Sequence, residues 1–386
     1  MNATLLSRRH FARLIGTALG ASAVVPPLAR AGAPPIAPAA GRHGGLPPGT
    51  IRIDSNENPY GPSPKATEAM ALPQGVPARY PDTLQDEMTA ALAKLHSVAE
   101  ENVILGCGSG EVLRMADMAF LGPGRNVVVA EPTFEAVLAF ARVTRADPVK
   151  VPLTGDHRHD LPVMAAACKD STGLVYLCNP NNPTGTIVTR EEMTAFFQRV
   201  PRTAVILVDE AYHHFVEDGH YASAFEWMGK APNLLVVRTF SKIYGLAGMR
   251  LGYGVASKEI IDAMRPHRVW SNANVAVLNA AIASLEDTGH VPRTRRLMNG
   301  TRQWLCAEME KDGRATIPSE ANFVMIDVGS DVAPLIAALR ERNVLVGRKF
   351  PSLPSWLRVS IGTPEEMRRF VSALRTLLPA RSTRAA

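Results

Sequence analysis

Apolar residues in the middle of the chain form short continuous runs that alternate with stretches of helical periodicity. The strand candidates are the valine-, isoleucine- and leucine-rich runs 103–106, 126–130, 173–178, 204–208 and 234–238. Strands that are apolar at every position are typical of a parallel sheet covered on both faces. Helical stretches at 111–120, 134–145 and 190–199 fall between them. Such βαβ units predict an α/β fold with a mostly parallel sheet covered by helices.

The pattern changes after the last of these strands, where a longer helical block at 273–311 should link two domains. The chain of 386 residues exceeds what one compact core usually spans. We expect an N-terminal arm and large domain over 50–290 and a smaller α+β domain over 291–386. The order strand, helix, strand, strand, helix is predicted for the smaller domain at 321–328, 332–342, 344–346, 357–361 and 364–378.

The N-terminus carries a different pattern. The pair Arg8-Arg9 precedes a weakly apolar stretch at 14–25, and Ala29-Arg30-Ala31 follows as a small-x-small sequence. These features are typical of a twin-arginine export signal, and the apolar stretch is too short for a stable membrane span. A basic or disordered tail is the alternative interpretation.

We therefore expect a signal peptide over 1–31, cleaved after Ala31, and a Pro- and Ala-rich linker over 32–49. The mature protein would be periplasmic or exported through the twin-arginine pathway, and it would carry no membrane anchor.

Composition and cysteine spacing argue against several other kinds of site. The net charge of +6 arises partly from arginines in the two tails, so a nucleic-acid surface is not implied. The four cysteines lie far apart, without C-x-x-C or metal-ligand spacing, so we predict neither a metal site nor a disulfide. They are Cys107, Cys168, Cys178 and Cys306.

Two segments of unusual composition follow strand candidates. In GCGSGE at 106–111, small residues let the backbone approach an anion, and free N–H groups of a helix start attract it. A plain tight turn explains that segment equally well when it is taken alone. In NPNNPTG at 179–185, two prolines fix the loop and hold the Asn182 amide ready to donate a hydrogen bond. A structural turn would need no such run of asparagines, so we favour a binding role.

An apolar strand candidate ends abruptly at Asp209. A carboxylate in such a low-dielectric position is costly unless it faces a cation, although capping of a following helix is the alternative. Taken alone, this motif leaves both a cationic ligand opposite Asp209 and a helix cap open.

Lys242 follows another strand candidate and lies beside the hydroxyl groups of Thr239 and Ser241. A desolvated lysine loses its charge more readily, as Schiff-base chemistry requires, whereas a single such lysine is more often a solvated surface group. Arg250 lies eight residues further on (250 − 242), and two intervening glycines let the chain fold back towards a phosphate.

The four motifs in this order resemble the fold-type I pyridoxal-phosphate aminotransferases of class I and II, and among them the histidinol-phosphate aminotransferase subgroup. DSNENPYGP at 54–62 is similar to the N-terminal signature of that subgroup, and WLRVSIGT at 356–363 to its C-terminal one. The resemblance extends from residue 51 to residue 378. It implies a homodimeric transaminase with pyridoxal phosphate as cofactor. By a ping-pong mechanism, an amino group would move between an amino acid or amino-alcohol phosphate and a 2-oxo acid.

The resemblance also implies a role for each matching residue. Lys242 would carry the cofactor as a Schiff base and move protons, Asp209 would pair with the pyridine nitrogen, and Tyr212 would donate to the ring oxygen. Further cofactor contacts would come from Ser109, Gly110, Phe134, Asn182, Thr239, Ser241 and Arg250, with Tyr80 reaching in from the second subunit. Substrate contacts would come from the anion-binding Arg358 and from Asn58 and Arg348.

Two features leave the substrate open. Histidine biosynthesis is cytoplasmic, whereas this sequence predicts export, and residues 344–351 match only loosely the segment that supplies a second phosphate-binding arginine. Arg348 can serve in that role. Another pyridoxal-phosphate reaction, such as that of a lyase, decarboxylase or oxidase, is an alternative, because a fold does not fix a reaction. A non-catalytic binding protein is disfavoured by the intact Lys242, Asp209 and Arg358.

Overall fold

The computed structural model describes residues 46–379. The expected signal peptide over 1–31 and most of the expected linker lie outside the described residues. Pro47 and all the described residues after it belong to one compact unit.

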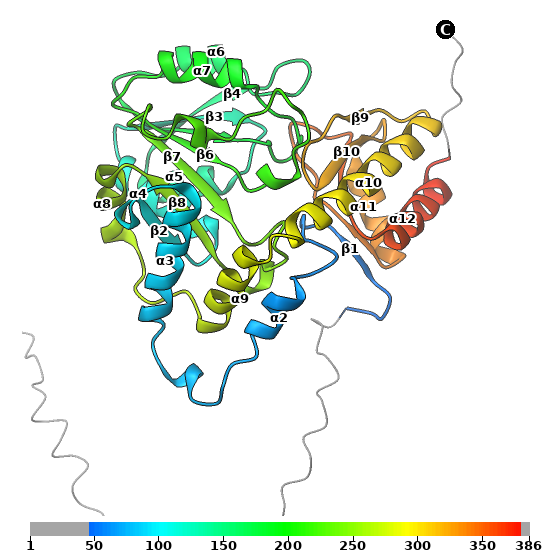
Figure 1. Cartoon of the computed structure of the whole chain (residues 1–386). Helices are drawn as coiled ribbons and strands as arrows, with labels where there is room; N and C mark the ends of the chain where they lie inside the picture. Colours follow the sequence, from blue (N-terminus) through cyan, green and yellow to red (C-terminus); the bar gives the residue numbers. More distant parts are fainter. Residues whose placement is uncertain (1–45, 380–386) are drawn as a thin grey trace, which may run out of the picture. The chain divides into compact units, whose positions relative to one another are not determined.

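A seven-stranded sheet forms the centre of the larger part of the molecule (Figure 1). Five neighbouring strands run parallel in the order β7-β6-β5-β3-β4, and β8 lies between β2 and β7, antiparallel to both. The strands are β2 (Val103–Gly106), β3 (Asn126–Glu131), β4 (Asp147–Pro152), β5 (Thr172–Cys178), β6 (Val205–Asp209), β7 (Leu234–Thr239) and β8 (Gly252–Ala256).

Helices cover both faces of this sheet, as successive side chains of β3 show. Val127 and Val129 pack into a core with residues of α4 (Ser109–Phe120), α5 (Ala136–Thr144) and α8 (Lys258–Met264). Val128 and Ala130 point the other way and pack with residues of α6 (Leu161–Ala166) and α7 (Arg190–Arg199). Because side chains alternate between faces along a strand, a sheet buried on both faces requires apolar residues at every position. This explains the continuous apolar runs in the sequence.

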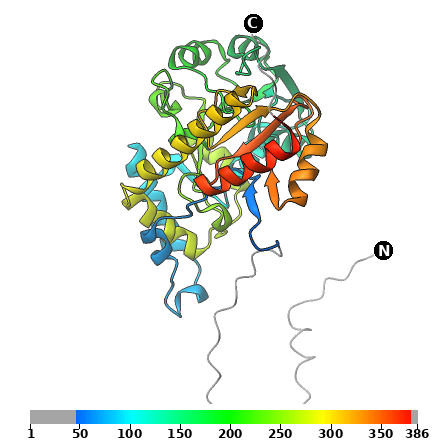
Figure 2. The same cartoon turned by 90° about the vertical axis from the view of Figure 1, so that its right-hand side faces the viewer.

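The C-terminal part contains a three-stranded antiparallel sheet in the order β12-β10-β9 and a parallel pair that joins β1 near the N-terminus to β11. Its last helix, α12, lies beside the connecting helix α10 (His290–Lys311) in Figure 2. The elements are β1 (Ile51–Ile53), β9 (Thr316–Ile317), β10 (Phe323–Asp327), α11 (Val332–Glu341), β11 (Val344–Val346), β12 (Trp356–Ser360) and α12 (Pro364–Leu377).

The remaining helices connect these parts and flank them. They are α2 (Pro64–Ala69), α3 (Asp82–His96), α9 (Val275–Glu286) and α10 (His290–Lys311), with the short 3-10 helices η1 (Val76–Ala78), η2 (Glu100–Asn102), η3 (His213–Phe215), η4 (Ala224–Trp227), η5 (Ala247–Met249) and η6 (Arg265–His267). The single helical block expected at 273–311 is corrected to two helices, because the chain leaves the helical conformation at Asp287 (φ −85°, ψ 77°).

The expected α/β fold with a mostly parallel, helix-covered sheet is confirmed. No helix within residues 46–379 is both long and apolar enough to span a membrane. All four cysteines are free thiols, and Cys178 alone among them is fully buried.

Candidate active site

The topology of the sheet gathers the motifs at one edge. Since β5, β6 and β7 are parallel, the segments that follow them begin at the same edge of the sheet. The antiparallel β8 begins at this edge: Gly252 pairs with Gly106, the last residue of β2, and with Thr239, the last residue of β7. The glycine-rich turn after β2 and the arginine just before β8 therefore meet beside the lysine that follows β7.

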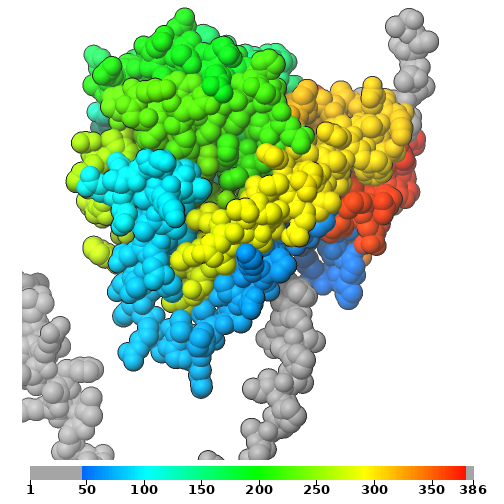
Figure 3. Space-filling view, viewed as in Figure 1, coloured from blue at the N-terminus to red at the C-terminus, as the bar shows by residue number. Residues whose placement is uncertain are grey.

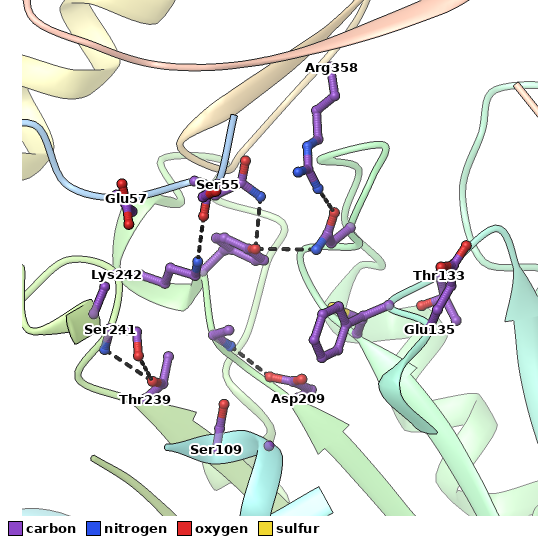
Figure 4. Close-up of a pocket in the computed structure, with 18 of the residues that line it drawn as sticks. Ser55, Glu57, Ser109, Thr133, Glu135, Asp209, Thr239, Ser241, Lys242 and Arg358 are labelled. Carbon is purple, nitrogen blue, oxygen red and sulfur yellow. Dashed lines mark hydrogen bonds between the residues drawn. The ribbon is translucent and has the colours of Figure 1, made fainter. Parts of the chain in front are cut away.

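A cavity of about 460 Å³ opens at this edge (Figure 4). It contains most of the residues that the sequence assigned to a cofactor or substrate: Ser109, Gly110, Phe134, Asn182, Asp209, Tyr212, Thr239, Ser241, Lys242, Arg250, Arg348 and Arg358. One site is thus formed by residues from segments 54–62, 106–111, 179–185, 239–250 and 356–363, and two of its hydrogen-bonded residues lie 304 positions apart.

Asp209 ends β6 with its carboxylate almost completely buried. Its Oδ2 accepts a hydrogen bond from the Tyr176 hydroxyl at 3.0 Å, and its Oδ1 accepts one from the Ala211 amide at 3.1 Å. Burial raises the pKa of Asp209 to about 6, and Tyr176 opposes that rise. No ion pair to Asp209 occurs within residues 46–379, so this carboxylate is suited to face a cationic ligand group.

The Lys242 side chain extends along the cavity, and its amine donates to the carbonyl oxygen of Ser55 at 3.2 Å (Figure 4). Removal from bulk water, aided by the positive charge of Arg358, lowers the pKa of Lys242 to about 8. The amine therefore loses its proton more readily than an ordinary lysine does, which a nucleophilic or proton-accepting amine requires.

Tyr212 lies between two asparagine amides. Its hydroxyl oxygen accepts hydrogen bonds from Asn56 Nδ2 at 3.0 Å and from Asn182 Nδ2 at 3.4 Å. Burial raises the pKa of Tyr212, so the phenol keeps its proton. That proton is available for a ligand oxygen in the cavity.

Arg358 reaches the same network from β12, a strand of the small sheet. Its Nη1 donates to Asn182 Oδ1 at 2.7 Å, and its Nη2 donates to the carbonyl oxygen of Asp54 at 2.9 Å. Its Nε is buried and has no hydrogen-bond partner among the described residues. The guanidinium is thus held in place while part of its donor capacity stays unused.

An anion cradle closes the opposite end of the cavity. Ser109 and Gly110 begin α4, a helix of 12 residues whose first N–H groups are free to bind an anion. Arg250 donates to the Ser241 hydroxyl at 3.2 Å, and Thr239 donates to the same hydroxyl at 2.9 Å. Gly108 has φ +80°, and a Cβ there would lie 2.2 Å from Arg250 Nη2, so the guanidinium approaches this turn only because the residue is glycine.

Two residues assigned to the site from the sequence lie elsewhere. The Asn58 amide donates to the carbonyl oxygens of Ile243 at 2.9 Å and Gly61 at 3.3 Å, and the residue does not line the cavity. It ties the N-terminal arm to the lysine-bearing segment instead. Tyr80 is 85% exposed and follows η1, in the segment that protrudes at the lower end of Figure 3. Its predicted role requires a second subunit.

Sequence reasoning missed Tyr176, Asn56 and Cys178. Tyr176 lies inside an apolar strand, and a tyrosine there gives no signal beyond packing until the β5–β6 pairing places it beside Asp209. Asn56 falls within the DSNENPYGP signature, which was the available clue. Cys178 is opposite Asp209 in the parallel register and lines the floor of the cavity.

These residues fit pyridoxal phosphate. The anion cradle suits its phosphate, the buried carboxylate of Asp209 suits its protonated ring nitrogen, and the Tyr212 phenol suits its ring oxygen. The Lys242 amine suits its aldehyde.

Comparison with known proteins agrees with this geometry. Residues 48–374 match the family described as Aminotransferase class I and II. The histidinol-phosphate aminotransferase of Moorella thermoacetica is 40% identical over 332 residues, covering 85% of each protein. That of Symbiobacterium thermophilum is 40% identical over 330 residues, covering 85% of this chain and 90% of the relative.

A solved structure shows the same fold. The histidinol-phosphate aminotransferase of Sinorhizobium meliloti, in complex with pyridoxal-5'-phosphate, is 28% identical, covers 85% of this chain and 90% of its own, and superposes with a TM-score of 0.80. The chain belongs to the aminotransferase class I and II family and is a pyridoxal-phosphate-dependent aminotransferase.

Proposed function

We propose that the amino donor is an amino acid or an amino-alcohol phosphate and that the acceptor is a 2-oxo acid, exchanged by a ping-pong mechanism. One observation carries this proposal: the cavity that holds Lys242 and Asp209 also contains two arginines, Arg348 and Arg358, suited to anionic substrate groups.

Each of these site residues would have a distinct role in the reaction. When bound, pyridoxal phosphate supplies an electron-withdrawing ring that stabilises negative charge at the substrate α-carbon. Asp209 would keep the ring nitrogen of the cofactor protonated by opposite-charge stabilisation. The Lys242 amine would accept the proton from the substrate α-carbon and deliver it to the cofactor carbon. Arg358 would orient the substrate by its carboxylate or phosphate, and the Tyr212 phenol would donate to the ring oxygen of the cofactor.

A panel of donors and acceptors tests this proposal. Glutamate, histidinol phosphate and aromatic amino acids should each be assayed with 2-oxoglutarate or another 2-oxo acid on the protein without residues 1–31. Stoichiometric formation of a new amino acid, with parallel double-reciprocal plots, supports ping-pong transamination. Release of carbon dioxide, ammonia or peroxide without an acceptor would instead indicate a decarboxylase, lyase or oxidase. A spectrum unchanged by every amine would indicate a binding protein.

We propose in addition that the enzyme acts as a homodimer in which Tyr80 of each subunit completes the phosphate site of the other. The support is the exposure of Tyr80 and its match to the family pattern. Tyr80→Phe should lower cofactor affinity without changing the dimer measured by light scattering. A monomeric, fully active enzyme would refute the dimer.

Export through the twin-arginine pathway is a further proposal, supported by Arg8-Arg9 and the stretch that follows. Changing both arginines to lysine should trap an active precursor in the cytoplasm, whereas the unchanged protein should be found in the periplasm, cleaved after Ala31. An unchanged protein that stays in the cytoplasm with Met1 retained would refute export.

A further inference from the structure

A second cavity, here called the outer groove, lies beside the catalytic cavity. It has a volume of about 530 Å³ and is lined by residues that follow β1, residues of α11 and residues at and after the end of β11. Ser55, Arg348 and Arg358 line both cavities, so the two spaces meet at these residues. A ligand held at Arg358 is therefore within reach of the outer groove.

The outer groove is strongly cationic. Arg340 and Lys349 line it together with Arg348 and Arg358, whereas Asp54 is the only carboxylate among its described lining residues. Four basic side chains against one acidic side chain give a concave surface with a positive potential, which concentrates anions.

The protein neutralises these cations only in part. Arg348 forms an ion pair with Glu135 at 2.6 Å, and Lys349 forms one with Asp331. Arg340 makes no ion pair or side-chain hydrogen bond with any residue of the described part of the chain. At least one charge of the outer groove is thus free for a ligand.

The junction between the two cavities is fixed in place. Arg358 is only 9% exposed, and hydrogen bonds to Asn182 and to the Asp54 backbone hold its guanidinium. A small substrate bound at this arginine would leave the outer groove empty, whereas a substrate with a second anionic group could reach across the junction.

We propose that the outer groove is a second anion subsite, which binds the distal carboxylate or phosphate of acidic donors and acceptors while Arg358 holds the first anionic group. Arg340 and Lys349 are then specificity-determining residues remote from the reacting atoms. The inference rests on the proposed transamination of amino acids and 2-oxo acids.

Steady-state kinetics of the cofactor-loaded enzyme test the subsite. The variants are Arg340→Gln, Lys349→Gln and the double variant, and the donors are glutamate against glutamine and O-phosphoserine against homoserine. Each single change should raise KM for the doubly anionic donors about threefold to fivefold, the range of a partly exposed ion pair, and the double change should raise it further. KM for the neutral-side-chain donors and all kcat values should stay near those of the unaltered enzyme.

Arg342→Gln is the matched control. Arg342 lies just beyond α11, its Nη1 donates to the Ala338 carbonyl, and it lines neither cavity, so its loss removes the same charge from the same region. Arg342→Gln should change KM neither for the doubly anionic donors nor for the donors with neutral side chains. Inorganic phosphate should compete with glutamate for the unaltered enzyme and should compete more weakly for the double variant.

The outcomes separate the alternatives. An increase in KM confined to glutamate identifies a carboxylate subsite, and an increase confined to O-phosphoserine identifies a phosphate subsite. The subsite is overturned if KM rises equally for glutamate and glutamine. It is also overturned if Arg342→Gln raises KM as much as the groove variants do. If the unaltered enzyme transfers no amino group from any donor, the proposed function itself fails, and this result is distinct from an active enzyme that is insensitive to the groove variants.

Discussion

Replacing Arg358 by Ala should impair donors that carry a carboxylate far more than donors that carry none. A guanidinium has five N–H donors, and the structure commits two of them, to Asn182 and to the Asp54 carbonyl. Three remain for a substrate, so a carboxylate can be bound without breaking either bond. Such a charge-assisted pair is worth about 1.5 to 3 kcal/mol, which corresponds to roughly a ten- to hundredfold loss of kcat/KM.

The assay compares glutamate with a primary amine that lacks any acidic group, and cofactor affinity is measured separately because Asn182 loses a partner in the variant. Arg358→Lys should recover only part of the loss, since an ammonium lacks the planar fork. A loss with histidinol phosphate as well would show that the group recognises anions in general. Equal losses for glutamate and the simple amine would refute the reasoning and would mean that Arg358 stabilises the fold.

Four further predictions concern three buried ionisable groups. Lys242→Ala should abolish turnover and the visible absorbance of the lysine-bound cofactor while leaving the circular dichroism spectrum unchanged. In the unaltered protein, the rate of covalent cofactor uptake by the apoenzyme should increase as the pH approaches about 8, because only the neutral amine attacks. Asp209→Ala should still bind the cofactor but slow α-proton removal about a thousandfold or more, measured by rapid-mixing spectroscopy. Asp117 is fully buried, with its pKa raised to about 6 by burial, so its ionised form destabilises the fold above that pH. Asp117→Asn should therefore raise the melting temperature at pH 8, and this gain should disappear as the pH falls towards 4; a gain that does not depend on pH would contradict this.

Strands and helices with a clear pattern could be predicted from the sequence, and those shaped by long-range pairing could not. The expected helix at 190–199 has the observed bounds, since Thr189 and Glu192 form a capping box visible in the sequence. In contrast, β8 was missed, because Gly252 and Gly254 weaken strand propensity. Packing requires glycine at 252, because a Cβ there would lie 2.2 Å from the Ser109 backbone nitrogen.

The same distinction holds for the residues of the candidate site: some could be predicted from the sequence, and others depend on long-range pairing. Asp209 and Lys242 could be found because the first ends a buried strand and the second follows one, and a charged group is unusual at such positions. Tyr176 could not be found, because its hydroxyl meets Asp209 only through the pairing of β5 with β6. Asn58 has the residue type of a ligand-binding group, but its amide is engaged by backbone carbonyls that come together only in the folded chain.

The same burial that prepares the site for its cofactor also destabilises the cofactor-free protein. Burial raises the pKa of Asp209 to about 6 and lowers that of Lys242 to about 8. The folded state therefore disfavours an ionised Asp209 above pH 6 and a protonated Lys242 below pH 8. Near pH 7 both charged forms are costly. A ligand that places a cation opposite Asp209 and binds the Lys242 amine covalently removes both costs. Part of its binding free energy therefore comes from removing these two unfavourable charges of the apoenzyme.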